Sequence, residues 1–191
     1  MPPNPGPWKG LWNYQSIPKI DIFIWTVLHN GILTTDNLRR KGWALPSRCP
    51  LCCCAEENVE HLFLCCDFTK EVWKAILWPN AVNLPDSTME LISCWSSLSP
   101  FDLSKKNLLK TMWMWIPKFV CWKVWLERNN RVFKETSRLP IQVVIKAKIM
   151  LAEALNSKPD LSNMAPISAE EERWMKEFHL NTQCQETSKP P

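Results

Sequence analysis

The stretch CPLCCCAEENVEHLFLCC, residues 49–66, contains six of the nine cysteines of the chain and one of its three histidines. Thiols at this density indicate a disulfide framework, a lipid-anchoring patch or a metal site. The first residues, MPPNPGPWKGLWNYQ, lack the basic segment, apolar core and cleavage site of a secretory signal. We therefore expect an intracellular, reducing environment, where disulfides are rare.

The spacing within this stretch favours a structural zinc site. Cys49 and Cys52 are separated by two residues, so both thiolates can bind one ion from a single tight turn. His61 and one of the two final cysteines, Cys65 or Cys66, complete a set of four ligands. The predicted cofactor is one structural Zn2+ ion.

Helix geometry leaves the fourth ligand open. If NVEHLFLCC forms one α-helix, Cys65 lies on the same face as His61, because residues four apart share a face, and Cys66 points away. If that helix ends after Leu64, Cys66 can turn back toward the metal. It then precedes a helix that begins near Asp67, whose N-terminal dipole favours a thiolate.

The rest of the chain is predicted to be mainly helical. Twelve tryptophans and sixteen prolines against four glycines indicate several short helices with aromatic packing. Apolar residues recur at helical spacing, and no long alternating strand pattern is present. The helical segments are IPKIDIFIWTVLHN, TTDNLRR, DFTKEVWKAILW, LSKKNLLKTMWMW, PKFVCWKVWLERNNRVFKE, LPIQVVIKAKIMLAEAL and EEERWMKEFHL.

Residues 108–126 form the most hydrophobic run and approach the length of a transmembrane helix. Three lysines within the run argue against a membrane span, because each costs about 2.5 to 3.5 kcal/mol near the bilayer centre. We instead predict two helices that break at Pro117, since proline lacks the N–H group that a helix interior needs. The predicted core stripe comprises Met112, Trp115, Phe119, Trp122 and Leu126.

Composition divides the sequence into five segments. They are a Pro/Trp-rich arm (1–17), a small zinc-stabilised helical domain (18–78), a linker (79–100), a helical extension that is first basic and then acidic (101–180) and a disordered tail (181–191).

Positive charge is concentrated in the middle of the chain. Residues 101–150 contain eleven Lys and Arg against three Asp and Glu, whereas residues 1–100 contain eight against nine. Such a block either lies on solvated helix faces or contacts an anionic partner such as RNA or DNA. The candidate nucleic-acid contacts are Arg39, Arg40, Lys41, Arg48, Lys105 and Lys106.

Several short motifs occur in a specific order: LW, IPKIDIFIW, the threonine of ILTTDNL with the basic RRKG after that segment, CPLC, EEN, HLFLCC and FTKEVW. In this order they resemble the reverse-transcriptase zinc-binding domain of plant LINE-type, non-LTR retrotransposon proteins. Further on, CWKVWLERNNRVF resembles the W-x-x-W-x-x-R-N-x-x-x-F segment that follows this domain in such proteins.

The resemblance implies which cysteine is the fourth ligand. In the family the final cysteine stands before the run that leads into the closing helix, which implies Cys49, Cys52, His61 and Cys66 as the ligands and makes Cys65 a variable position. The family usually has glycine after the second ligand, where this chain has Cys53. We therefore expect Cys53 either to strain the turn or to compete as a ligand.

The resemblance also bears on location and function, and it implies the nucleus as the compartment, with the cytoplasm as the alternative. The polymerase of such proteins has a Y-x-D-D turn, but the single tyrosine here, Tyr14, is followed by QSI, and no endonuclease or RNase H constellation is visible. We expect a non-catalytic zinc-binding protein derived from a LINE-type reverse transcriptase that contacts RNA or DNA nonspecifically, with no membrane or small-molecule substrate. The alternative is a structural or protein-interaction module, or a retrotransposon remnant without selected activity.

Overall fold

The computed structural model describes residues 8–101, 103, 108–157 and 176. Its helices are α1 (Trp8–Asn13), α2 (Pro18–Leu28), α3 (Thr35–Arg40), the π-helical turn η1 (His61–Cys65), α4 (Asp67–Leu77), α5 (Thr88–Cys94), the 3-10 turn η2 (Trp95–Leu98), α6 (Leu108–Lys134) and α7 (Pro140–Asn156). Within these ranges the only extended pairing is an isolated bridge between Arg48 and Glu56. The predicted mainly helical fold is confirmed.

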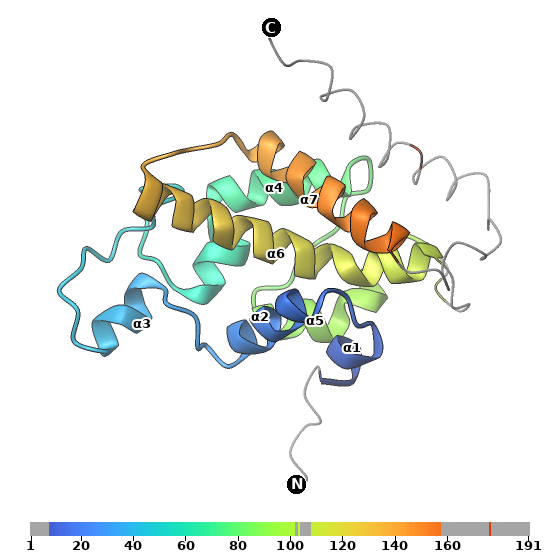
Figure 1. Cartoon of the computed structure of the whole chain (residues 1–191), viewed down its shortest axis with the longest axis horizontal. Coiled ribbons are helices and arrows are strands. Elements are labelled where there is room, and N and C mark those ends of the chain that lie inside the picture. Colours follow the sequence, from blue (N-terminus) through green and yellow to red (C-terminus); the bar gives the residue numbers. More distant parts are fainter. Residues whose placement is uncertain (1–7, 102, 104–107, 158–175, 177–191) are drawn as a thin grey trace, which may run out of the picture.

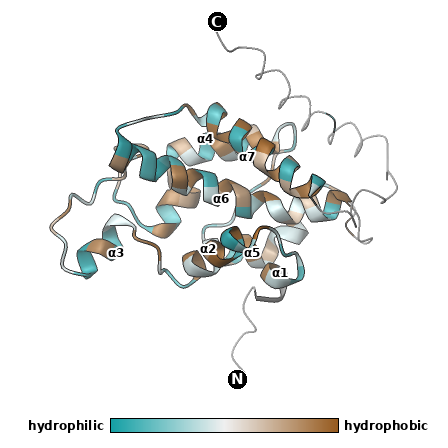
Figure 2. Cartoon of the chain, viewed as in Figure 1, coloured by the Kyte–Doolittle hydropathy of each residue, from teal (hydrophilic) through white to brown (hydrophobic). Residues whose placement is uncertain are grey.

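The long helix α6 runs through the middle of the molecule (Figure 1). Helices α7 and α4 pack together on one side of it, and α2 packs on the other side together with α5. Helix α3 and the loop after it lie at one end. Buried residues from all the longer helices form one continuous core, and α2 contributes a mostly apolar segment to it (Figure 2).

Local sequence signals account for most helix boundaries. Pro18 begins α2, where its missing N–H has no intrahelical partner to lose. Thr34 precedes α3, and Gly42, with φ of 89°, follows it. Helix α4 begins at Asp67, as predicted. The predicted helix EEERWMKEFHL, apart from Lys176, and the predicted disordered tail lie outside the described residues.

Helix α6 is the centre of the core. From Leu109 to Trp122 its apolar residues are buried on every side, which is typical of a helix enclosed by other helices. Of the predicted stripe, Met112, Trp115, Phe119 and Trp122 are buried, and Leu126 is half-buried against the core. None of the helices in the described ranges is both long enough and apolar enough to cross a membrane.

The prediction that the helix breaks at Pro117 is wrong. Helix α6 continues through Pro117, although the proline cannot donate a hydrogen bond to the carbonyl of Trp113 four residues earlier. The indole of Trp95 replaces it, because its Nε1 donates to this carbonyl oxygen at 2.7 Å. In return, Nε1 of Trp113 donates to the carbonyl of Trp95 at 3.1 Å, and the two rings stack with centroids 4.9 Å apart.

The segment predicted as a linker contains helical structure. Residues 79–100 include α5 and η2, whose residues Leu91, Ile92 and Trp95 are buried in the core. A capping signal was present in the sequence, since Ser87 accepts a hydrogen bond from the backbone N–H of Glu90. The apolar residues of α5 form only a short helical pattern, and the serines and prolines around it are typical of a linker.

A buried ion pair joins the N-terminal segment to α6. The ammonium group of Lys118 is 2% exposed and donates to the carbonyl oxygens of Leu11 and Tyr14 and to the carboxylate of Asp21. Asp21 also accepts hydrogen bonds from the backbone N–H and the hydroxyl of Ser16. All three ammonium protons therefore have acceptors, which offsets the cost of burying the charge.

Replacing Trp95 with phenylalanine removes the donor that compensates for Pro117. We expect this change to lower the free energy of unfolding by about 1 to 3 kcal/mol, measured by urea denaturation of zinc-loaded protein, because the buried carbonyl of Trp113 loses its partner. In a Pro117→Ala background the new backbone N–H supplies that partner, so the cost of Trp95→Phe should be smaller by about 1 kcal/mol.

The matched control is Trp73→Phe, which removes an equivalent bond from the indole of Trp73 to the carbonyl of Phe63. Its cost should be the same with and without Pro117→Ala. If the Trp95 and Pro117 changes were simply additive, the compensation would be disproved.

Candidate metal centre

The zinc loop, defined as residues 48–66, begins with a tight turn at Cys49. The backbone N–H of Cys49 donates to the carbonyl of Ala55, and the N–H of Cys53 donates back to the carbonyl of Cys49. Backbone groups of Cys52 and Leu51 favour the thiolate form of Cys49 and so oppose the rise in its pKa. The turn therefore brings the sulfurs of Cys49 and Cys52 close together, so that both can bind one metal ion.

His61 is positioned by a short helical segment with an unusual register. Asn58 caps this segment, because its side-chain oxygen accepts a hydrogen bond from the backbone N–H of His61 at 2.8 Å. From His61 to Cys65 the backbone forms a π-helical turn, closed by the N–H of Cys66, which donates to the carbonyl of His61 at 2.7 Å. This bond spans five residues instead of four.

The π-helical turn brings Cys66 back to the side of His61. Cys66 itself is extended, with φ of −64° and ψ of 129°, and precedes α4. It therefore stands at the first turn of α4, where the helix dipole favours negative charge and the backbone of Thr69 helps to lower the pKa of the Cys66 thiol. Cys66 is buried and Cys65 is exposed.

The four candidate donor atoms fit a tetrahedral zinc ion. Atoms of Cys49, Cys52, His61 and Cys66 lie within 4.8 Å of one another. The sulfurs of Cys49 and Cys66 are 4.0 Å apart, and the Cys52 sulfur is 3.3 Å from Nε2 of His61. Zn–S bonds of about 2.3 Å in a tetrahedron require separations of about 3.8 Å, so only small adjustments are needed.

The protonation of these groups suits metal binding. Burial lowers the pKa of His61, which keeps the imidazole neutral and able to coordinate. The hydrogen bond between Cys49 and Cys66 raises the pKa of Cys49, as does burial, whereas the same bond lowers the pKa of Cys66. Zinc binding requires thiolates, so it displaces the protons that these thiols hold.

Three further thiols of the stretch lie outside the donor cluster. Cys53, Cys54 and Cys65 are all exposed. Cys53 occupies the position where glycine was expected, and its φ of 58° is in the left-handed region that favours glycine. The cysteine at this position therefore strains the turn and is not part of the donor cluster.

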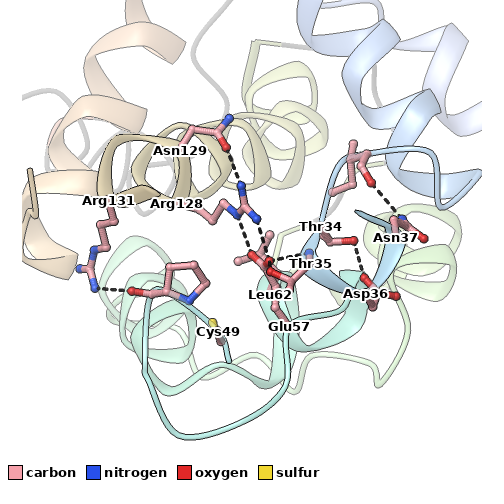
Figure 3. A network of polar contacts seen from close by, with 12 residues as sticks. Thr34, Thr35, Asp36, Asn37, Cys49, Glu57, Leu62, Arg128, Asn129 and Arg131 are labelled. Carbon is pink, nitrogen blue, oxygen red and sulfur yellow. Dashed lines mark hydrogen bonds and ion pairs between the residues drawn. The ribbon is translucent and has the colours of Figure 1, made fainter. Parts of the chain in front are cut away.

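Arg131 of α6 supports the turn from outside. Its guanidinium donates to the carbonyl oxygens of Pro50 and Leu51, between the first two ligands, at 3.3 and 2.8 Å. It also lies over the ring of Phe68 and pairs with the carboxylate of Glu127. Figure 3 shows Arg131 extending from α6 toward the loop that carries Cys49.

A second contact between α6 and the zinc loop is the Glu57 network, formed by Thr35, Glu57 and Arg128. The guanidinium of Arg128 donates to both carboxylate oxygens of Glu57, at 2.7 and 2.8 Å (Figure 3). Glu57 is 1% exposed and also accepts hydrogen bonds from the backbone N–H and hydroxyl of Thr35. Burial raises the pKa of Glu57, but these bonds outweigh it and hold the pKa below its ordinary value.

The sequence offered signals for these supporting residues. Glu57 belongs to the EEN motif, and Arg128 belongs to the R-N-x-x-x-F motif. Both motifs were part of the resemblance, but only the structure pairs them. Arg131 occupies an unspecified position of the R-N-x-x-x-F motif, so nothing in the sequence indicated its contact with the zinc loop.

The candidate nucleic-acid contacts separate into three sets. Arg39, Arg40 and Lys41 are exposed in the last turn of α3 and at its C-cap, and Arg40 pairs with Asp36 at 2.6 Å. Arg48 is exposed in the zinc loop, where its guanidinium donates to the carbonyl of Cys53. The remaining candidates, Lys105 and Lys106, lie outside the described residues.

A helical domain with a Cys3His donor set of this geometry belongs to the class of small zinc-binding modules. Among families of this class, the one whose model matches residues 3–73 of the chain is zinc-binding in reverse transcriptase. This part of the chain is a reverse-transcriptase zinc-binding domain, as the motifs predicted, and its donor set supports the predicted zinc cofactor. No curated protein and no solved structure matches the chain.

Serine substitutions distinguish the two adjacent cysteines. We expect Cys66→Ser to lose the zinc ion, because it removes one of the clustered donors, and Cys65→Ser to retain one ion per chain. Native mass spectrometry measures both. Structural zinc contributes on the order of 10 kcal/mol of folding energy, so Cys66→Ser should also lose protease resistance. Zinc retained by Cys66→Ser but lost by Cys65→Ser would reverse the assignment.

Glycine at position 53 should relieve the strained turn. We expect Cys53→Gly to raise the free energy of unfolding by up to about 1 kcal/mol, because a left-handed backbone costs a non-glycine residue about 1 to 2 kcal/mol and part of this gain is lost to glycine entropy. Cys54→Gly is the control, since Cys54 does not have a positive φ: glycine there relieves no strain, adds the entropic cost and removes the hydrogen bond from the Cys54 thiol to the carbonyl of Cys52. A thermal melt in which both variants shift equally would refute the strain.

Proposed function

We propose that the chain is a non-catalytic zinc-binding module of a LINE-type reverse transcriptase that contacts RNA or DNA nonspecifically. The observation that carries this proposal is the exposed basic end of α3, which is attached to the zinc loop through the Glu57 network. Cations there can neutralise phosphates without reading the bases, and such binding weakens steeply with salt.

The donor set supports a structural role for the metal. A catalytic zinc ion keeps one coordination position open for water or substrate, whereas four protein donors fill a tetrahedron. Cys49, Cys52, His61 and Cys66 are four such donors, and two of the cysteines are buried. The proposed module therefore uses zinc to fix the fold.

The excess of Lys and Arg in residues 101–150 overstates how many cations are available to bind a nucleic acid. Lys118 and Arg128 are buried in ion pairs, while Arg131 and Arg138 pair with the buried carboxylate of Glu127. These cations are used inside the fold. The cluster at the end of α3 is therefore the better candidate for the contact surface.

A protein-interaction module is the second candidate. The outer face of α2 exposes Ile22 and Trp25, which are 58% and 44% exposed, and Phe133 at the end of α6 is 74% exposed. Large exposed apolar side chains often mark binding surfaces for other proteins. In that case the zinc-loaded protein would be monodisperse and would not retain nucleic acid.

A charge-removal series tests the nucleic-acid proposal. We expect Arg39→Gln, Arg40→Gln and Lys41→Gln combined to weaken binding to single-stranded RNA and to lower the slope of log K against log salt by about 2, since each lost phosphate contact contributes about 0.7. Fluorescence anisotropy at several salt concentrations gives both quantities.

The matched control removes three exposed lysines from other helices, Lys74→Gln, Lys134→Gln and Lys146→Gln. It has the same net charge as the α3 variant and should keep most of the affinity and slope. Equal losses in both variants, or no RNA binding by the wild type at low salt, would refute the proposal.

A further inference from the structure

A tryptophan stands beside the basic cluster with most of its side chain in solvent. Trp43 is 62% exposed, although tryptophan is the side chain with the most apolar area to bury. It follows Arg39, Arg40 and Lys41 directly in the chain, across Gly42. We refer to Arg39, Arg40, Lys41 and Trp43 as the α3 surface.

The backbone around Trp43 has a fixed conformation. The N–H of Gly42 donates to the carbonyl of Arg39 at 2.9 Å, and the N–H of Trp43 donates to the carbonyl of Leu38 at 3.1 Å. This pair of bonds, with Gly42 at φ of 89°, is the Schellman motif that ends a helix. The position of Trp43 relative to the cations is therefore set by the helix end.

Helix α3 is itself held firmly against the rest of the fold. Its first residue, Thr35, is bound by Glu57, which in turn is bound by Arg128. The side-chain amide of Asn37 donates to the carbonyl oxygens of Asn30 and Ile32. A surface ordered in advance loses little entropy when a ligand binds.

The composition of this surface matches one class of ligand. Phosphates carry the negative charge that Arg39 and Lys41 can bind, and in the described part of the chain neither of these residues forms an ion pair. An exposed indole offers a flat face on which a base can stack, and only an unpaired base presents its own face. A duplex buries its base faces and can use only the cations.

We propose that the α3 surface binds single-stranded nucleic acid, with Trp43 stacked on an unpaired base and the neighbouring cations on the adjacent phosphates. This inference rests on the nucleic-acid contact proposed above and adds a preference for single strands. Base stacking on an aromatic side chain is tolerant of sequence, so the preference is for strandedness and not for a particular base.

The test compares Trp43→Ala with Trp78→Ala, a substitution of another exposed tryptophan, which directly follows α4 and is not part of the α3 surface. The probes are a labelled mixed-sequence 12-mer, as RNA and as DNA, and its duplexes. We expect Trp43→Ala to weaken single-strand binding about 5- to 150-fold, which is the effect of losing one stacked base, and to leave duplex binding within about twofold. Trp78→Ala should change neither, and Trp43→Phe should restore most of the single-strand affinity.

The salt dependence separates this inference from the proposed function. Trp43→Ala removes no charge, so its salt slope should equal that of the wild type, whereas the triple glutamine variant lowers the slope. If the triple variant loses binding but Trp43→Ala does not, stacking is refuted and the nucleic-acid contact stands. If the wild type binds no probe, or binds phosphatidylserine vesicles more tightly than the single strand, both proposals fail.

Discussion

The buried carboxylate of Glu57 is the interaction on which the arrangement of the metal centre depends. An unpaired carboxylate in the interior is costly, and removing one partner of a buried pair typically costs about 3 to 5 kcal/mol. Arg128 and Thr35 satisfy both oxygens of Glu57. Since these residues belong to α6, to α3 and to the zinc loop, one charge fixes three parts of the chain relative to one another.

The choice of the fourth metal ligand shows where sequence reasoning succeeds and where it fails. Spacing alone predicted the Cys-x-x-Cys pair and His61, because those ligands lie in short local patterns. It left Cys65 and Cys66 as alternatives, and an ideal α-helix favours Cys65. The structure instead has a π-helical turn, which places Cys66 in the donor cluster. Helix register at this point is not encoded by propensity, so only the family resemblance indicated Cys66.

Contacts between distant residues account for the other differences. The periods that predict α2, α4 and α7 are local, and these helices occur where expected. The continuity of α6 through Pro117 depends on Trp95, which no local pattern connects with it. Likewise, the burial of Lys118 depends on acceptors about a hundred residues earlier in the chain. A composition count could not distinguish such interior cations from a basic surface.

The support that α6 gives to the zinc loop has a consequence for the order of folding. All four donor residues have been synthesised once Cys66 is complete, but Arg131, which binds the turn between the first two donors, comes 65 residues later. At about 5 to 20 residues per second this interval lasts roughly 3 to 13 s. During it the nascent chain can bind zinc, yet the carboxylate of Glu57 still lacks Arg128. The metal centre therefore reaches its final stability only after α6 has been made, long after its own ligands are in place.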